Sequence, residues 1–434
     1  MELGGVLILV LSFLILLALG VPISFSIGIS TVLTMLVSID PIATFTTVAQ
    51  RMATGLDSFA LLAIPFFILA GQLMNKGGIA KRLIDFAKVL LGRLPGGLAF
   101  VNILAAMFMG AISGSSVAAA SAIGGFMGPR MEEEGYDKNF GAAVNITSST
   151  TGLIIPPSNI LIVYSLASGG VSIAALFVAG YIPGIIVGLS LMAVAGVYSF
   201  RKKYPVGEKI SLKEGLKKLL DAIPSLLLII IVIGGIVAGY FTATEASAIA
   251  VLYTFILSVV IYKEVKISEL PKILIESSST TAIVMLLIGA SIAMSWVMAY
   301  QNIPQTITSN LMGLTDNRIV ILLIINLILL AVGTFMDMTP AVLIFTPIFL
   351  PVVTALGMDP IHFGIVLVMN LSIGLCTPPV GSVLFVGCGV ANTTIEKVIK
   401  PLLPLYLAMF IALLLVTYLP DLSLILPKYF GLAN

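Results

Sequence analysis

The chain of 434 residues is 59% hydrophobic and only 10% charged, whereas a soluble globular domain has about 25% charged residues. This composition excludes a soluble enzyme and predicts an all-α polytopic membrane protein, in which each span takes about 20 apolar residues. The net charge of +2, from 22 basic and 20 acidic side chains, provides no extended basic surface, so nucleic acid is not an expected partner.

Few residues could support enzyme chemistry. The single histidine, His362, excludes zinc motifs of the HExxH type, and Cys376 and Cys388 form no CxxC pair. The sequence has no Gly-Lys dipeptide and therefore no P-loop for ATP. An intramembrane protease using Ser113 or Asp337 is the enzyme alternative, but it lacks a nearby base or a second buried aspartate. We therefore expect no enzymatic activity.

Apolar segments follow one another along the chain in two sets of equal number. The first set lies at 3–19, 22–38, 59–75, 97–129, 139–168 and 173–200, and the second at 222–240, 245–262, 273–299, 319–350, 361–391 and 402–420. Between them lies a stretch rich in lysine and arginine, which the positive-inside rule puts in the cytoplasm. The chain therefore reads as two halves.

The two halves align without a gap when the sequence is shifted by 222 positions, the separation of Ala119 and Ala341. The shift pairs mostly helix-breaking or turn-forming residues: Pro129 with Pro351, Gly135 with Gly357, Asp137 with Asp359, Gly152 with Gly374, and Pro156-Pro157 with Pro378-Pro379. Such residues indicate a shared backbone shape. The sequence thus predicts an internal structural repeat.

Basic residues indicate how the halves are oriented. The segment after the third span contains Lys76, Lys81, Arg82, Lys88 and Arg93, while its counterpart at 298–315 has no lysine or arginine. Equivalent loops therefore lie on opposite sides of the membrane. An inverted repeat of this kind is the usual architecture of secondary transporters with alternating access.

The repeat divides the chain into a scaffold, a moving transport domain and two arms that join them. We expect scaffold helices at 1–75 and 222–299, transport-domain halves at 97–200 and 319–434, a cytoplasmic linker at 201–221, a cytoplasmic amphipathic arm at 76–96 and a periplasmic arm at 300–318. Movement of the transport domain against the scaffold would be an elevator mechanism.

Four segments within the transport domain should be irregular. Segments 97–129 and 319–350 are long enough for two half-depth helices and a tip, with the polar or helix-breaking middles Ser113 to Ser116 and Gly333 to Pro340, so we expect two re-entrant hairpins. Segments 139–168 and 361–391 carry the double prolines, which should break their helices. Non-helical backbone at that depth must be buried in protein or line a cavity.

Free carbonyls and hydroxyls at such breaks are good ligands for a hard cation, and half-helix N-termini favour an anionic group. Small residues at Gly110 and Gly114 also fit ordinary helix packing. The candidate ligands are Ser113, Ser115, Ser116, Thr151, Ile155, Ser158 and Asn159 in the first half, and Thr334, Asp337, Thr339, Thr377 and Ser382 in the second.

Three charged residues need separate comment. Asp337 lies in an apolar run, where a charge costs about 2.5 to 3.5 kcal/mol, so we expect a cation or hydrogen-bond donor beside it. Glu245 fits a capping box with Thr242 and is also a candidate buried acid. Arg51, in a short outer loop, is the basic residue left available to a substrate carboxylate.

The motifs GAISGSSVAAASAIG, GLIIPPSN, GTFMDMTPAVLIFTPIFLPV and GLCTPPVGSVLFVG resemble those of the large permease (M) subunit of tripartite ATP-independent periplasmic (TRAP) transporters, in the ion transporter superfamily. The resemblance covers essentially the whole chain. It implies sodium-driven uptake of an organic acid, such as a C4-dicarboxylate or a sialic or other sugar acid, by an elevator motion in a bacterial inner membrane. It also implies two partners, a small four-helix membrane subunit (Q), expected here as a separate protein, and a periplasmic substrate-binding protein (P).

The resemblance also implies roles for individual residues. One sodium site would lie where the first tip meets the first proline break, and a second where the second tip meets Thr377 and Pro378. We expect sodium ligands at Ser113, Ser115, Thr151, Ile155, Pro156, Gly333, Thr334, Asp337, Thr339, Thr377 and Pro378, and substrate contacts at Ser115, Ser116, Ser158, Asn159 and Asp337, with Ser116 as the direct contact to the carboxylate.

Two other transport functions remain open. A stand-alone sodium-coupled carboxylate symporter of the same superfamily would need no binding protein. A passive channel is the third reading, although hairpins that close a central site suit alternating access better than an open pore.

Overall fold

The computed structural model describes residues 2–207 and 211–433, and within these ranges the chain is built of helices. The β pairing in the described part is one isolated bridge, between Pro95 and Val206. Eight helices of the described part are long and apolar enough to span a bilayer, and shorter apolar helices accompany them. The predicted all-α polytopic membrane architecture is thereby confirmed.

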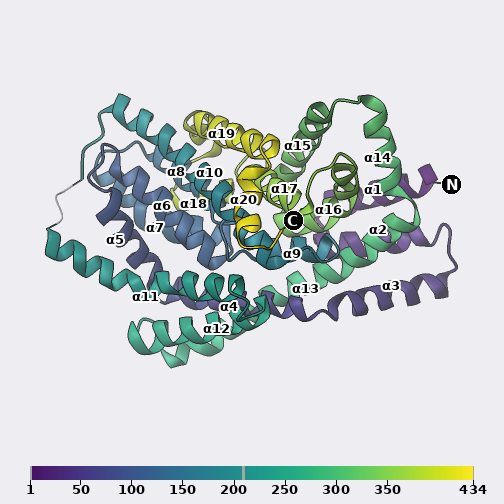
Figure 1. Cartoon of the computed structure of the whole chain (residues 1–434), viewed down its shortest axis with the longest axis horizontal. Helices are drawn as coiled ribbons and strands as arrows, with labels where there is room; N and C mark the ends of the chain where they lie inside the picture. The colour runs from purple at the N-terminus through teal and green to yellow at the C-terminus, as the bar shows by residue number, and fades with distance from the viewer. Residues whose placement is uncertain (1, 208–210, 434) are drawn as a thin grey trace.

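Over residues 2–207, the described part of the first half contains ten α-helices and one short 3-10 helix (Figure 1). They are α1 (Glu2–Ala18), α2 (Ile23–Met35), α3 (Pro41–Leu56), η1 (Phe59–Leu62), α4 (Ala63–Lys76), α5 (Ile79–Leu91), α6 (Gly97–Ser113), α7 (Ser116–Glu133), α8 (Lys138–Thr151), α9 (Asn159–Ala167) and α10 (Ile173–Lys202). Each long segment expected to be broken is divided between two helices.

The second half follows the same order. Its elements are α11 (Leu212–Val237), α12 (Ala243–Phe255) continued by the π-helix η2 (Ile256–Ile261), η3 (Ile267–Glu269), α13 (Leu270–Tyr300), α14 (Ile303–Leu314), α15 (Arg318–Phe335), α16 (Met338–Ala355), α17 (Pro360–Leu375), α18 (Ser382–Val390), α19 (Ile395–Tyr418) and α20 (Asp421–Tyr429). Helices α5 and α14 occupy the segments expected to form the two arms.

Helix α3 corrects one prediction, because Arg51 lies in this helix and not in a short loop. The segment has no long apolar run, since threonine and other polar residues interrupt it. Its start signal is nevertheless in the sequence: Asp40 accepts hydrogen bonds from the backbone N–H groups of Ile42 and Ala43, and Pro41 occupies the first turn. The Arg51 guanidinium lies 5.2 Å from the ring centroid of Trp296, so it has an aromatic partner.

The same helix pairings recur in both halves. Helix α6 packs on α8, and α15 packs on α17. The second helix of each tip then contacts the opposite half, because α7 packs on α18 and α16 packs on α9. The halves are therefore interlocked. This recurrence agrees with an internal repeat, while its inverted orientation in the membrane stays a prediction.

Glycines allow the close approach at both tip-and-break pairs. A Cβ on Gly152 would lie 2.2 Å from the Cα of Gly110, and one on Gly374 would lie 2.4 Å from the Cα of Gly333. No side chain fits between backbones at that distance. Both contacts join the end of a tip helix to the end of a broken helix.

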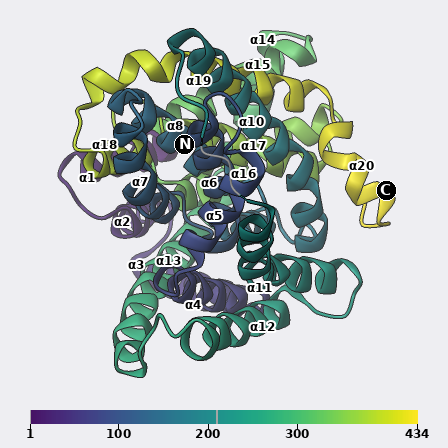
Figure 2. The ribbon, with the colours of Figure 1, turned by 90° about the vertical axis from the view of Figure 1, so that its left-hand side faces the viewer.

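Two views show how the helices are grouped. In Figures 1 and 2, helices α4, α11, α12 and α13 lie on one side of the molecule, and α6, α8, α10, α17 and α19 lie on the other. Helix α4 packs on α12 and α13, and also touches α6. The boundary between the two groups is where the candidate site lies.

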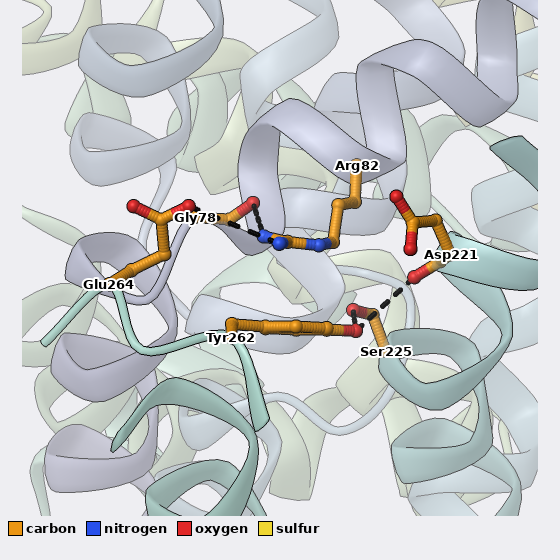
Figure 3. Close-up of polar contacts among 6 residues, drawn as sticks. All are labelled: Gly78, Arg82, Asp221, Ser225, Tyr262 and Glu264. Carbon is orange, nitrogen blue, oxygen red and sulfur yellow. Dashed lines mark hydrogen bonds and ion pairs between the residues drawn. The ribbon is translucent and has the colours of Figure 1, made fainter. Parts of the chain in front are cut away.

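Helix α5 is attached to the first group by Arg82 (Figure 3). The Arg82 guanidinium stacks 3.5 Å from the ring centroid of Tyr262, donates to the Gly78 carbonyl at 3.0 Å and lies 3.9 Å from a carboxylate oxygen of Glu264. The Tyr262 hydroxyl in turn lies 3.1 Å from Ser225 Oγ and donates to the Asp221 carbonyl at 3.2 Å. Arg82 thus joins α5 to the residues that follow η2, and Tyr262 in turn contacts α11.

We predict that Arg82→Lys destabilises the protein, because lysine keeps the charge but loses the planar group that stacks on Tyr262. Such a cation–π contact contributes about 1 kcal/mol. Thermal unfolding in detergent should show a lower midpoint for Arg82→Lys and a larger decrease for Arg82→Ala. Lys81→Ala is the matched control, because Lys81 is exposed on the same helix. Equal midpoints for the Arg82 and Lys81 variants would contradict this role.

Candidate functional site

A cavity of about 440 Å³ lies between the two groups of helices. This volume is in the range of pockets that hold small organic molecules. The walls come from α4, α13, both tips and the start of α9. Of the predicted site residues, the structure brings together Ser113, Ser115, Ser116, Asn159, Asp337 and Thr339 around this cavity.

The first tip is a short turn between α6 and α7. Gly114 takes a left-handed conformation with φ of +62°, which ends α6 and lets the chain reverse. Ser115 then caps α7, its Oγ accepting from the Ala118 N–H at 3.2 Å. Ser113 Oγ donates to the Ser115 carbonyl at 3.3 Å. These bonds are weak and local, so the hydroxyl oxygens of the tip keep acceptor capacity.

The second tip places one carboxylate in the cavity. Asp337 is the residue before α16, but its side chain does not cap that helix. It is exposed, and it lines the cavity next to Met338 and Thr339. Among the described residues no lysine or arginine lines this cavity, and no ion pair involves Asp337. Of the two expected partners, a cation or a hydrogen-bond donor, the cation is therefore not found beside Asp337 in the described part of the chain.

Three helices begin at the cavity wall. Ser116 starts α7, Asn159 starts α9 and Met338 starts α16, and all three residues line the cavity. The N-terminus of a helix carries free N–H groups and the equivalent of about half a positive charge. The helix starts therefore favour an anion at this wall through backbone dipoles, without a cationic side chain.

The first proline break lies behind the first tip. The Pro156-Pro157 peptide bond is cis, as is Pro378-Pro379 in the second break. Thr151 and Ser158 are fully buried, and their hydroxyls donate to the Ser148 and Leu153 carbonyls, both at 2.6 Å. Thr151, Ile155, Pro156 and Ser158 do not line the cavity. Of the residues expected near this break, Asn159 alone does.

The second break contacts the second tip through Gly381. The Gly381 N–H donates to the Thr334 carbonyl at 3.0 Å, and a Cβ on Gly381 would lie 2.8 Å from the Thr377 carbonyl oxygen. Thr334 and Thr377 therefore meet at one glycine. Four of the predicted sodium ligands, Gly333, Thr334, Thr377 and Pro378, lie outside the cavity lining.

The buried hydroxyls share one bonding pattern. The hydroxyls of Thr334 and Thr377 donate to the carbonyls of Ala331 and Ile373, both at 2.7 Å. The hydroxyls of Thr151 and Ser158 donate to carbonyls in the same way. A hydroxyl whose proton is engaged in this way keeps lone pairs for another partner. Oxygen lone pairs are the ligands that hard cations prefer. The donor set at both breaks therefore fits sodium.

Sequence reasoning missed the wall opposite the tips. Gln72 and Asn75 of α4 and Thr280 of α13 line the cavity, although they lie in segments expected to be scaffold. The sequence contains a weak signal for a polar face on α4, because Gln72 and Asn75 are its two uncharged polar side chains and lie three residues apart. No feature of the sequence predicts that α4 packs on α13.

Two charged residues considered in the sequence lie elsewhere. Glu245 forms the predicted capping box, accepting from the Thr242 N–H at 2.8 Å while Thr242 Oγ1 accepts from the Glu245 N–H at 3.3 Å. It does not line the cavity, and neither does Arg51.

Comparison with known families gives one match over nearly the whole chain. Residues 10–422 match the model of the DctM component of the tripartite ATP-independent periplasmic transporters. The YgiK protein of Salmonella typhimurium is 56% identical over 420 residues, covering 97% of this chain and 96% of its own. The C4-dicarboxylate TRAP transporter large permease protein DctM of Pseudomonas aeruginosa is 40% identical over 409 residues, covering 94% and 95%.

Two further similarities concern subunit composition and fold. The isethionate TRAP transporter permease protein DctMQ of Oleidesulfovibrio alaskensis is 41% identical over 421 residues, which are 96% of this chain but 65% of that protein. Among solved structures, the YdaH transporter of Alcanivorax borkumensis superposes with a TM-score of 0.66 at 14% identity, covering 92% of this chain and 91% of its own. This last similarity concerns the fold alone.

We predict that Gly374→Ala disturbs the second tip, because its Cβ would overlap the backbone of Gly333, which cannot rotate away. Overpacking of this kind costs about 1 to 3 kcal/mol. The measurement is the thermal midpoint in detergent, together with the yield of monodisperse protein. Gly125→Ala, in a helix where a Cβ meets nothing within 4 Å, is the control and should match the wild type. A Gly374→Ala midpoint as high as that of the control would disprove the tight contact.

Proposed function

The chain belongs to the family of DctM components of the tripartite ATP-independent periplasmic transporters, and from this premise we propose that it carries an organic acid into the cell by sodium-coupled secondary active transport. It is a transporter permease by family and a multi-pass membrane protein by its helices. The proposed location is the bacterial inner membrane. The proposed substrate is a C4-dicarboxylate or a sialic or other sugar acid.

The observation that supports an anionic substrate most directly is the convergence of three helix N-termini on one cavity. The starts of α7, α9 and α16 all line it. Oriented backbone dipoles of this kind bind carboxylates without the desolvation cost of a buried arginine or lysine. Ser116, at the first position of α7, is the proposed direct contact.

Charge balance supports the coupling to sodium. The cavity lining contains one ionisable carboxylate, that of Asp337, and no lysine or arginine among the described residues. An organic anion placed beside Asp337 would be repelled by its like charge. Sodium ions on the tip and break oxygens would offset that repulsion. Substrate and sodium would then bind most favourably together.

We also propose the partners and the motion. The relative named DctMQ is longer than the part that matches this chain, and we propose that its additional part corresponds to a small membrane subunit, with which this chain assembles. A periplasmic binding protein would deliver the acid. The inverted halves would form a transport domain that moves against the scaffold as an elevator, with α5 and α14 as arms.

The deciding experiment is uptake in proteoliposomes that contain this chain and its small subunit. Succinate, sialic acid and isethionate are tested with and without the binding protein and an inward sodium gradient. Uptake that requires both establishes the proposal. Uptake by this chain alone would assign it to the stand-alone symporters, and uptake that is indifferent to sodium would refute the coupling.

We predict that Asp337→Asn loses at least about tenfold of sodium-driven uptake, because a neutral amide no longer offsets the charge of a nearby cation, an interaction of about 1 to 4 kcal/mol at partly hydrated sites. The measurement is the initial uptake rate as a function of sodium concentration. Asp316→Asn removes the same charge from an exposed position outside the cavity and should leave the rate unchanged. An Asp337→Asn protein with the sodium dependence of the wild type would exclude this role.

Ser116→Ala should raise the half-saturation concentration of the acid more than about threefold, since it removes one hydrogen bond. The measurement is uptake at saturating sodium as a function of acid concentration. Ser121→Ala, on the exposed side of the same helix, serves as its control. Equal half-saturation concentrations in the two variants would rule out direct contact by Ser116.

A further inference from the structure

Helices α4 and α13 form the cavity wall that lies opposite the tips. Ile64, Ile68, Gly71, Gln72 and Asn75 line the cavity, and this spacing puts them on one face of α4. The face extends over twelve residues, from Ile64 to Asn75, or about 16 Å at 1.5 Å per residue. The cavity therefore runs along α4 to its last turn.

The polar members of this wall have unused hydrogen-bonding capacity. Asn75 Oδ1 is buried and has no hydrogen-bond partner. Thr280 Oγ1 donates to the Glu276 carbonyl at 3.0 Å, so its lone pairs remain available. An unpaired polar atom next to a cavity is costly unless a ligand or water completes it. These groups therefore favour a polar occupant.

The wall is held in position just beyond these residues. Lys76 and Glu276 form an ion pair of 2.7 Å that joins α4 to α13. Ser258 Oγ donates to the Leu73 carbonyl at 3.1 Å, which joins α4 to the π-helical end of α12. The amides of Gln72 and Asn75 and the hydroxyl of Thr280 are therefore presented by helices fixed to one another.

The first tip rests directly on this wall. A Cβ on Gly71 would lie 2.9 Å from the Ser113 carbonyl oxygen, so the backbone of α4 touches the tip there. Gln72, next in sequence, lines the same cavity as Ser115 and Ser116. An acid held at the tip would therefore have the polar side chains of α4 within its surroundings.

The direction in which the cavity leads follows from charge. Asn75 is followed by Lys76, and α5 continues with Lys81 and Arg82, which the positive-inside rule puts on the cytoplasmic side. Both members of the Lys76–Glu276 pair are partly exposed, at 37% and 38%. The polar part of the wall is thus at the cytoplasmic end of the cavity.

We propose that Gln72, Asn75 and Thr280 form a fixed polar wall that hydrogen-bonds the organic acid while the cavity faces the cytoplasm, and thereby set its affinity at release. This inference rests on the proposed function. The wall is uncharged, so it recognises hydroxyl, carbonyl or carboxylate oxygens by hydrogen bonds alone. Such contacts form only in the state that faces the cytoplasm, because the tips move away from the wall in the state that faces outward.

The first test separates the two faces of the membrane. Gln72→Leu, Asn75→Leu and Thr280→Val are reconstituted, and the half-saturation concentration of the acid that the wild type transports fastest, among succinate, sialic acid and isethionate, is measured from each side. We expect a rise of about three- to tenfold on the cytoplasmic side alone, the effect of one lost hydrogen bond. No change, or an equal change on both sides, would overturn the inference.

Thr281→Val is the matched control for Thr280→Val, because it makes the same substitution at the next position, which does not line the cavity. We expect wild-type values from both sides for this variant. A change equal to that of Thr280→Val would attribute the effect to helix α13 and not to the wall.

The second test does not depend on transport. Both native cysteines are buried, so Thr280→Cys can be labelled with a membrane-impermeant maleimide in inside-out vesicles. Each of the three acids, at saturating sodium, is tested for protection. At least threefold slower labelling with one of them, and no such effect for Thr281→Cys, supports the wall. If no acid slows the labelling of Thr280→Cys, the inference about the wall is overturned. This result is independent of the uptake experiment on the wild type, which decides the proposed function.

Discussion

The whole arrangement depends on one requirement, which is that backbone N–H and C=O groups inside a bilayer must find partners within the protein. Helices meet this requirement by themselves, but the turns at Gly114 and Met336 and the two proline breaks do not. Each tip is therefore packed against another part of the protein. The first tip lies against α4 at Gly71, and the second tip bonds to Gly381 of the second break. Both tips line one cavity, which makes that cavity the candidate binding site.

Packing of backbone on backbone explains why glycines occur where they do. Contacts between Gly110 and Gly152, and between Gly333 and Gly374, join each tip to its break. Hydroxyls at both breaks donate to nearby carbonyls and keep their lone pairs, which suits a small hard cation. They also bring helix N-termini to the cavity, which suits an anion. The fold thus suits both a cation and an anion with few charged side chains. This arrangement is favourable in a bilayer, because a buried charged side chain costs free energy there.

Much of this could be predicted from the sequence, where local signals are strong. The double prolines, the Ser113–Ser116 tip and the Asp337 tip are visible as helix breakers inside long apolar runs, and their recurrence after 222 positions separates them from chance. Helix α3 was missed, because hydroxyl and other polar residues remove the apolar run that marks a span. The cavity wall of α4 and α13 was missed for a different reason. Its residues meet only through tertiary packing, and no periodicity within either helix indicates that partner.

The exchange of partners between the halves has a consequence for synthesis. Helix α7, at Ser116–Glu133, packs on α18, at Ser382–Val390, and α9 packs on α16. Contacts so distant in sequence form late, because the chain must close a long loop first. The ribosome therefore releases most of the protein before α7 can pack on α18. Until then, α7 and α9 lack the cover that α18 and α16 give them, although the first tip already lies against α4 of its own half.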